Sequence, residues 1–332
     1  MKKSCFFVLL FLAGCAFGQN INWGVTYSYP HALWLFDDET KAKSVLTTTA
    51  DELGVKNYRL EAYWNWLQKD SNKQLNLNSI EWQLEVMEKY DAQTVILCIG
   101  LKVPHWPEYH IPEWAKHLPE EESKQKILNY LELIVKHYSN DSRITHWQVE
   151  NEPFFKFGRG KPFSDQEKFL KKEIETVRSL DKLNRKIIVT NPGDRGDFRK
   201  TARDADIVGL SYYSISYWKE MRIYVEHKIS YNLLFKSVRN PKSWRKKINN
   251  ETNDKPVWLI ELQAEPWGPT DNKFLSVDES AKSMSPTRFR GNLKSVIDAG
   301  FTDIYFWGAE WWLWMKDNGH PEMWEEVKKV LK

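Results

Sequence analysis

The stretch ITHWQVENEP, residues 144–153, joins a run of strand-forming side chains to an Asn-Glu-Pro corner. Ile144 and Trp147 suit a strand, and Pro153 cannot continue it, because proline lacks a backbone N–H and disfavours helix before it. Glu152 is thereby placed at the end of a buried strand, where a carboxylate is costly unless it has a partner or a chemical role. We therefore take this stretch as the centre of both the fold and the candidate site.

The rest of the chain alternates between strand-like and helix-like patterns. The apolar run TVILCIG, residues 94–100, is typical of a strand buried on both faces of a parallel sheet. Helical spacing follows in segments such as residues 79–90, where Trp82, Val86 and Met87 recur on one face. The predicted strands are residues 22–27, 57–62, 94–100, 143–150, 186–190, 206–211, 255–260 and 302–307, and the predicted helices are residues 39–53, 79–90, 121–138, 165–180, 194–205, 286–299 and 321–331.

Eight strands separated by helices predict an α/β fold, a closed (β/α)8 barrel or TIM barrel. A length of 332 residues fits one such barrel or two ordinary domains, and no linker or low-complexity segment divides the chain. The sequence therefore predicts a single barrel domain over residues 19–332. Residues 214–254 form the longest irregular insertion in this scheme.

The first 18 residues have the layout of a secretory signal peptide, with two lysines, an apolar run too short to span a membrane, and small residues. Residues 16–18 (AFG) resemble an ordinary cleavage site, whereas residues 12–15 (LAGC) resemble a bacterial lipobox that would lipidate Cys15. We favour ordinary cleavage, because the first strand begins near Ile21 and leaves almost no tether. The protein is expected to be secreted or periplasmic, with a membrane-anchored lipoprotein as the alternative.

The composition narrows the classes of function. A formal net charge of +3 gives no support to a nucleic-acid partner. The 17 tryptophans exceed what a core needs, and their faces are good platforms for sugar rings. Cys98 is the only cysteine after the signal, so no intrachain disulfide forms and a buried, inert thiol is expected. His105 and His110 lack the ligand pattern of a metal site, and neither a metal nor another cofactor is expected.

Polar and aromatic side chains fall at or just after the ends of several predicted strands. In a (β/α)8 barrel these carboxyl ends form the face on which active sites are built. The segment PVWLIE, residues 256–261, supplies a second strand-end carboxylate, and two carboxyl groups are what acid/base hydrolysis of a glycosidic bond requires. The candidates at this face are Arg59, His105, Asn151, Glu152, Tyr213, Glu261 and Trp307.

Retaining glycosidases hold one carboxyl group as acid/base and the other as nucleophile, about 5 to 5.5 Å apart. We assign the acid/base role to Glu152, which must hold a proton near the working pH, and the nucleophile role to Glu261. Arg59 and Tyr213 are the groups expected to stabilise the negative charge on Glu261. Glu265, which follows in the loop beyond that strand, is the alternative nucleophile.

These motifs resemble the clan A glycoside hydrolases, the (β/α)8 group that carries Asn-Glu on strand four and a Glu on strand seven. The resemblance covers almost the whole mature chain. Residues 151–153 (NEP) are similar to the clan's acid/base corner, which implies that Asn151 holds the substrate 2-hydroxyl. Residues 255–261 (KPVWLIE) are similar to its strand seven, which implies that Glu261 is the nucleophile.

Other strand ends extend the resemblance. Residues 209–213 (GLSYY) resemble the GLNYY segment of family 1 enzymes, in which the second tyrosine, here Tyr213, bonds the nucleophile. Ser211 replaces the usual asparagine, so that subsite is expected to differ. Arg59 matches the strand-two arginine, and Trp307 matches the strand-eight tryptophan that floors the sugar site. The loops VPHWPEYHIPEW, ELQAEPWGP and FWGAEWWLW look like those of a cellulase-like bacterial branch.

Aromatic-rich loops after strands three, seven and eight favour an endo-acting cleft over a pocket. His105 and Trp267 are expected to contact sugar, and Glu310 either contacts the substrate or belongs to a structural ion pair. The insertion carries nine lysines and arginines over residues 219–247. This basic stretch is either a solvated face or a site for an anionic glycan or a membrane surface.

The resulting hypothesis is an exported, monomeric, retaining glycoside hydrolase that acts on a β-linked oligo- or polysaccharide. A non-catalytic glycan-binding barrel is one alternative, and it would bind glycans without cleaving them. A transglycosylase that uses the same carboxylates is the other, and its products would show sugar acceptors outcompeting water.

Overall fold

The computed structural model describes residues 20–71, 74–193, 196–227 and 241–332. The predicted signal peptide and lipobox, residues 1–18, lie outside these ranges. None of the helices within them is long and apolar enough to cross a bilayer.

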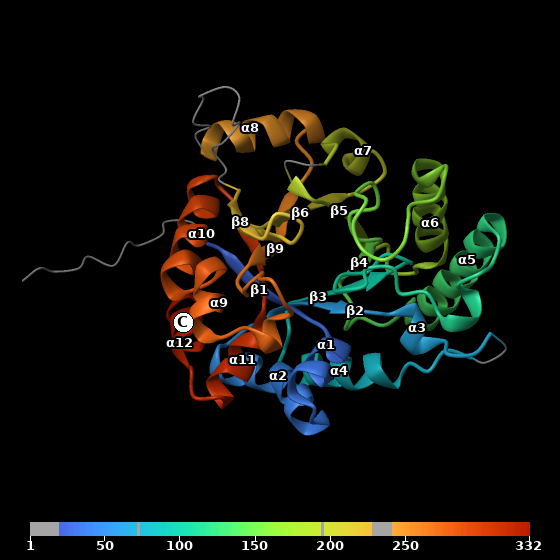
Figure 1. Ribbon diagram of the computed structural model, residues 1–332. Coiled ribbons are helices and arrows are strands. Elements are labelled where there is room, and N and C mark those ends of the chain that lie inside the picture. The colour runs from blue at the N-terminus through green and yellow to red at the C-terminus, as the bar shows by residue number, and fades with distance from the viewer. Residues whose placement is uncertain (1–19, 72–73, 194–195, 228–240) are drawn as a thin grey trace, which may run out of the picture.

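Eight parallel strands close into a barrel in the order β1-β10-β9-β6-β5-β4-β3-β2. Figure 1 shows the strands at the centre of the molecule with helices around them. The predicted single-domain (β/α)8 barrel is therefore confirmed. The barrel strands are β1 (Asn22–Tyr27), β2 (Asn57–Glu61), β3 (Thr94–Ile99), β4 (His146–Val149), β5 (Lys186–Asn191), β6 (Ile207–Tyr212), β9 (Val257–Gln263) and β10 (Asp303–Trp307).

The longer predicted helices are all present, with ends that differ from the predicted ones by a few residues. They are α2 (Glu39–Glu52), α4 (Asn78–Lys89), α5 (Glu120–Tyr138), α6 (Gln166–Leu180), α10 (Pro286–Asp298) and α12 (Glu322–Leu331). The predicted helix over residues 194–205 is shorter, because Asp197 caps it and starts α7 (Phe198–Ala202). Shorter helical pieces that the sequence analysis missed are α1 (Tyr29–Phe36), α3 (Trp64–Leu67), η1 (Glu113–Ala115), η3 (Asn272–Phe274), α9 (Val277–Ser283) and α11 (Ala309–Asp317).

The prediction that residues 214–254 are irregular was wrong for much of this insertion. Strand β7 (Ile215–Trp218) pairs antiparallel with β8 (Ile223–Glu226), and helix α8 (Pro241–Thr252) leads back to the barrel. The hairpin could have been predicted, since ISYW and IYVE are β-branched and aromatic runs that flank a short polar turn.

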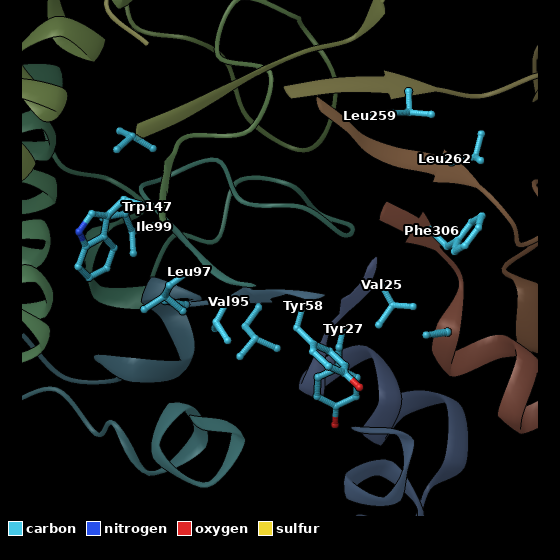
Figure 2. Packing of buried hydrophobic residues seen from close by; sticks show 14 of the residues in the cluster. Val25, Tyr27, Tyr58, Val95, Leu97, Ile99, Trp147, Leu259, Leu262 and Phe306 are labelled. Atoms are coloured by element: carbon cyan, nitrogen blue, oxygen red, sulfur yellow. The ribbon is translucent and has the colours of Figure 1, made fainter. Parts of the chain in front are cut away.

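Successive strand residues face opposite sides of the barrel wall. Val95 and Leu97 point outward into the large core between strands and helices (Figure 2), whereas Ile96 belongs to a separate inner cluster with Ile188 and Ile260. Burying each such side chain stabilises the fold by roughly 1.5–3 kcal/mol. Alternate residues of one strand therefore hold the helices outside and fill the barrel inside.

The inner face becomes polar toward the carboxyl ends of the strands. Cys98, on the same side of β3 as Ile96, is buried, and its Sγ donates to Gln148 Oε1 at 3.3 Å. The prediction of a buried thiol is thus confirmed, and burial raises the pKa of the Cys98 thiol to about 12, which disfavours the reactive thiolate. Above this level the barrel interior carries hydrogen-bonding and charged groups instead of apolar side chains.

Strand β4 ends earlier than residues 143–150 predict. Glu150 and Glu152 adopt left-handed backbone conformations, with φ of 61° and 45°. Such conformations cost of order 1–3 kcal/mol each for residues other than glycine, and they turn the chain out of the sheet after Val149. Glu152 therefore lies on a strained corner above the barrel and not on the strand itself.

Candidate active site

Glu261 points into the barrel from β9 and is only 4% exposed. Arg59 Nη1 donates to its Oε1 at 2.6 Å, and the Tyr213 hydroxyl donates to its Oε2 at 3.1 Å. Both carboxylate oxygens thus have a donor, one of them cationic. The Tyr213 contact is the one that the family resemblance implies. These partners stabilise negative charge on Glu261, which a nucleophile or a base requires.

Arg59 connects three strands of the barrel. It is fully buried on β2, its Nε donates to Gln148 Oε1 at 2.8 Å, and its Nη2 donates to Asn151 Oδ1 at 3.1 Å. Together with the ion pair to Glu261, these bonds fix the plane of the guanidinium group. Arg59 therefore ties the position of Glu261 to the corner that follows β4.

Glu152 is held at that corner through its main chain. Its backbone N–H donates to Thr190 Oγ1 at 2.7 Å, and Lys102 Nζ donates to its carbonyl oxygen at 3.1 Å. Burial, followed by the negative charge of Glu261, raises the pKa of the Glu152 carboxyl to about 7. A carboxyl group with that pKa is protonated in about half of the molecules at neutral pH and in most of them below it, as a general acid requires.

Asn151 accepts on one side and donates on the other. Its Oδ1 receives hydrogen bonds from Arg59 Nη2 at 3.1 Å and from the Thr190 hydroxyl at 2.9 Å. Its Nδ2 donates to Glu108 Oε2 at 3.2 Å. An amide Nδ2 carries two hydrogens, and the bond to Glu108 uses one of them.

Glu108 is a residue of this site that the sequence analysis missed. It is 8% exposed in the loop after β3, and Lys102 Nζ lies 3.9 Å from its Oε2. Burial raises the pKa of the Glu108 carboxyl to about 8. The signal was available, since Glu108 lies in the same Pro- and His-rich loop as His105, at the edge where the other candidates meet.

Trp307, at the end of β10, and His105, in the loop after β3, contact each other. Their rings stack with centroids 4.1 Å apart and an interplanar angle of 29°, and His31 stacks on the other face of His105 at 4.5 Å. Trp307 Nε1 donates to Glu265 Oε1 at 2.9 Å, and Asn272 Nδ2 donates to Glu265 Oε2 at 2.9 Å. Glu265 thus fixes the Trp307 ring, whereas Arg59 and Tyr213 bond Glu261.

Glu310 and Trp267 occupy different depths. Glu310 is 1% exposed at the start of α11, and its Oε1 accepts from the Ser28 backbone N–H at 2.6 Å. Trp267 is half-buried at the mouth, where its ring meets the Tyr213 ring at 5.5 Å and 86°. The structure thus places Trp267 beside the candidate nucleophile, and it places Glu310 beneath the surface, where it links α11 to the β1–α1 corner.

Burial raises the pKa of the Glu310 carboxyl in the folded protein to about 8. The free energy of unfolding therefore falls as pH rises from the pKa of the unfolded chain toward 8, because the unfolded chain releases this proton first. Glu310→Gln should remove that cost while keeping the bond to Ser28. We expect the free energy of unfolding of the variant, relative to the parent, to rise by roughly 4 kcal/mol between pH 5 and pH 8.5. Urea unfolding at the two pH values measures this, and the exposed Glu322→Gln should show no such change. Parallel pH dependence in Glu310→Gln and the parent would contradict the effect.

Within the described ranges, no three His, Cys, Asp or Glu side chains gather in a way that could hold a metal ion. His110 Nε2 lies 3.1 Å from the Val103 carbonyl oxygen, and His105 is enclosed by the rings described above.

Comparison with known proteins gives the same fold. A β-galactosidase from the psychrophilic Marinomonas ef1 has a TM-score of 0.62 and 12% identity over 94% of this chain and 59% of its own. A variant of the GH5_18 enzyme of Bifidobacterium longum subsp. longum ATCC 55813, solved with Manβ1-4GlcNAc, has a TM-score of 0.61 and 10% identity over 94% and 78%. A family 10 endo-β-1,4-xylanase of Gloeophyllum trabeum has a TM-score of 0.56 and 14% identity over 94% and 96%.

These structures are all clan A glycoside hydrolases, so the resemblance inferred from the motifs is confirmed at the level of fold. The chain spans less than two thirds of the β-galactosidase, 59% of its length. No protein-family model matches the sequence, and no curated protein is similar to it.

Proposed function

We propose that the protein is a retaining glycoside hydrolase acting on a β-linked glycan, with Glu152 as acid/base and Glu261 as nucleophile. The observation that carries the proposal is the unequal environment of the two carboxyl groups. Arg59 and Tyr213 donate to Glu261, whereas burial and the charge of Glu261 raise the pKa of Glu152 to about 7. A carboxylate that accepts from two donors beside a carboxyl group whose pKa is raised suits double displacement.

The reaction follows in two steps. In the first, Glu261 attacks the anomeric carbon, the glycosidic C–O bond breaks, and the proton of Glu152 passes to the leaving oxygen. In the second, Glu152, now a carboxylate, takes a proton from water, the water oxygen attacks the anomeric carbon, and the bond to Glu261 breaks. Asn151 would donate its remaining N–H to the sugar 2-hydroxyl, and Trp307 would lie under the ring.

The charge of the mouth favours a neutral sugar at the cleaved unit. The cations in contact with the site are Arg59 and Lys102, and both already bind protein oxygens. An anionic sugar would meet additional carboxyl groups there and no free cation among the described residues that form the site. The carboxyl groups of the site are Glu108, Glu152, Glu261 and Glu265.

A digestion panel tests the proposal. It should contain aryl β-galactosides, β-mannosides, β-glucosides and β-xylosides, Manβ1-4GlcNAc, and the matching polysaccharides. We expect hydrolysis of at least one β-linked member. Binding without cleavage across the panel would favour the non-catalytic glycan-binding barrel. Elongated products in place of free sugar would favour the transglycosylase.

The basic insertion contributes little to substrate binding in this proposal. Arg245 Nη1 donates to the carbonyl oxygen of Val257 at 3.4 Å, and its guanidinium lies 4.7 Å from the Phe301 ring. Val257 begins β9 and Phe301 precedes β10, so this contact lies at the amino ends of the strands, away from the catalytic face. Basic residues of the insertion within residues 228–240 lie outside the described ranges.

Replacing Arg245, Lys246 and Lys247 together by Ala should therefore leave kcat/KM within about twofold of the parent. Arg245→Ala alone should lower the free energy of unfolding by about 1 kcal/mol, because it loses the contact with Phe301. Steady-state kinetics and urea unfolding measure the two effects. A large loss of affinity in the triple variant, with unfolding changed no more than in Arg245→Ala alone, would restore the anionic-glycan hypothesis.

Export and the oligomeric state are part of the same proposal. The mature chain is expected to be a secreted or periplasmic monomer that begins at Gln19. N-terminal sequencing of the exported protein and its elution on gel filtration test this. A lipidated N-terminus at Cys15 would instead show a membrane-anchored lipoprotein.

A further inference from the structure

Aromatic side chains from separate loops meet above the candidate site. Phe157, in the loop after β4, contacts Trp267, in the loop after β9, with ring centroids 6.0 Å apart and an interplanar angle of 56°. Trp106, in the loop after β3, contacts Phe157 from the other side at 6.1 Å. Strands β5 and β6 lie between β4 and β9 in the barrel order, so the Phe157–Trp267 contact, called the aromatic bridge below, spans the mouth above them.

The backbone holds the Phe157 side of the bridge in place. The Arg159 N–H donates to the Pro107 carbonyl oxygen at 2.9 Å. A Cβ added at Gly158 would lie 2.6 Å from that same oxygen, and one at Gly160 would lie 2.3 Å from the Tyr109 ring. Only glycine permits this close approach, so the loop after β4 is packed tightly onto the loop after β3.

The Trp267 side is held as well. The Trp267 backbone N–H donates to Ser283 Oγ at 3.0 Å, and a Cβ at Gly268 would lie 2.7 Å from the Leu275 side chain. The Trp267 ring also rests against the Tyr213 ring at 5.5 Å, and the Tyr213 hydroxyl bonds Glu261. The bridge is thus connected to the candidate nucleophile through one tyrosine.

Phe157 connects the bridge to the acid/base candidate along the chain. Glu152 and Phe157 belong to the same loop, and the leaving oxygen must lie next to the group that protonates it. Two rings with centroids 6.0 Å apart leave no room for a sugar ring between them. Beneath them, Glu152 and Glu261 are 8% and 4% exposed.

We propose that the Phe157–Trp267 bridge determines specificity by closing the mouth on the leaving-group side. The interior of a long polysaccharide needs a groove open in both directions, and the bridge closes one of them. The protein would then act on short glycans and chain ends, which differs from the endo-acting cleft that the aromatic loops alone favour. This inference rests on the proposed function for its account of the substrate, but not for the closure itself.

Thiol labelling tests the closure without a substrate. In Glu152→Cys, a small reagent, methyl methanethiosulfonate, should react, whereas bulky fluorescein-5-maleimide should react slowly. Adding Phe157→Ala should speed the bulky reagent by at least about tenfold and change the small one little, since access is what the ring limits. Phe274→Ala, which removes a 67% exposed ring away from the bridge, is the matched control, and the buried Cys98 of the parent gives the background.

Equal rates of bulky labelling with and without Phe157 would overturn the closure, whatever glycan is cleaved. On an active substrate, Phe157→Ala and Trp267→Ala should each raise cleavage of the polymer relative to the disaccharide. Cleavage in the interior of a polymer shows as a rapid fall in viscosity per reducing end formed. If the parent protein gave this result, the proposed closure would also be overturned. An inactive parent whose labelling depends on Phe157 would contradict the proposed hydrolase and leave the closure standing.

Discussion

Glu261→Gln should lower kcat by about 10⁴- to 10⁶-fold, the largest effect expected of any single substitution in this protein. The amide cannot form the ester bond to the anomeric carbon, so the covalent glycosyl-enzyme intermediate cannot form. Arg59 and Tyr213 both donate to the Glu261 carboxylate, and Gln retains an oxygen for one of them. The fold should therefore survive, which circular dichroism and thermal unfolding check.

Glu265→Gln is the matched control for this prediction. Glu265 is half-buried and accepts from Trp307 and Asn272, so its loss should loosen the Trp307 ring without removing a reacting group. We expect a fall in kcat/KM of about tenfold, far smaller than at Glu261. If Glu265→Gln proved the more damaging of the two, the nucleophile would be Glu265.

Glu152→Gln should lower kcat/KM by about 10²- to 10⁴-fold for glycosides with poor leaving groups, because no proton reaches the leaving oxygen. Dinitrophenyl glycosides, whose leaving group needs no proton, should retain kcat/KM within about tenfold. This difference between leaving groups identifies a general acid. Equal losses on both kinds of substrate would point to a structural role for Glu152.

The pH dependence of activity tests the same assignment of Glu152 as the general acid. Burial and the charge of Glu261 raise the pKa of the Glu152 carboxyl to about 7, so the acid form is present below that pH and is lost above it. Activity of the parent should fall as pH rises through 7. In Glu152→Gln this alkaline fall should disappear for dinitrophenyl glycosides, and its persistence would assign it to another group.

Much of the fold could be predicted from sequence because each strand bears a local signal. The run at residues 94–100 and the corner at residues 151–153 mark buried strands and their ends without any knowledge of distant contacts. The order of eight such units then permits few topologies other than a barrel. The convergence of Arg59, Tyr213 and Glu261 follows from the barrel itself, since all three lie near strand ends that share one face.

What could not be predicted depends on contacts between loops. Glu108 joins the site only because its loop folds back over the corner, so that its carboxylate reaches Asn151. The aromatic bridge brings Phe157 and Trp267 together from loops separated by two strands, and no sequence periodicity reports such a pair. The left-handed backbone at Glu152 likewise breaks local preference, as residues at functional sites often do.

The anomer released first from a cleaved β-glycoside tests the central claim most directly. Proton NMR during the first minutes of hydrolysis, before mutarotation, distinguishes the two outcomes. Attack by Glu261 followed by attack by water predicts that the β-anomer appears first and the α-anomer only later. Initial release of the α-anomer would show direct displacement by water, and Glu261 would then be a base and not a nucleophile.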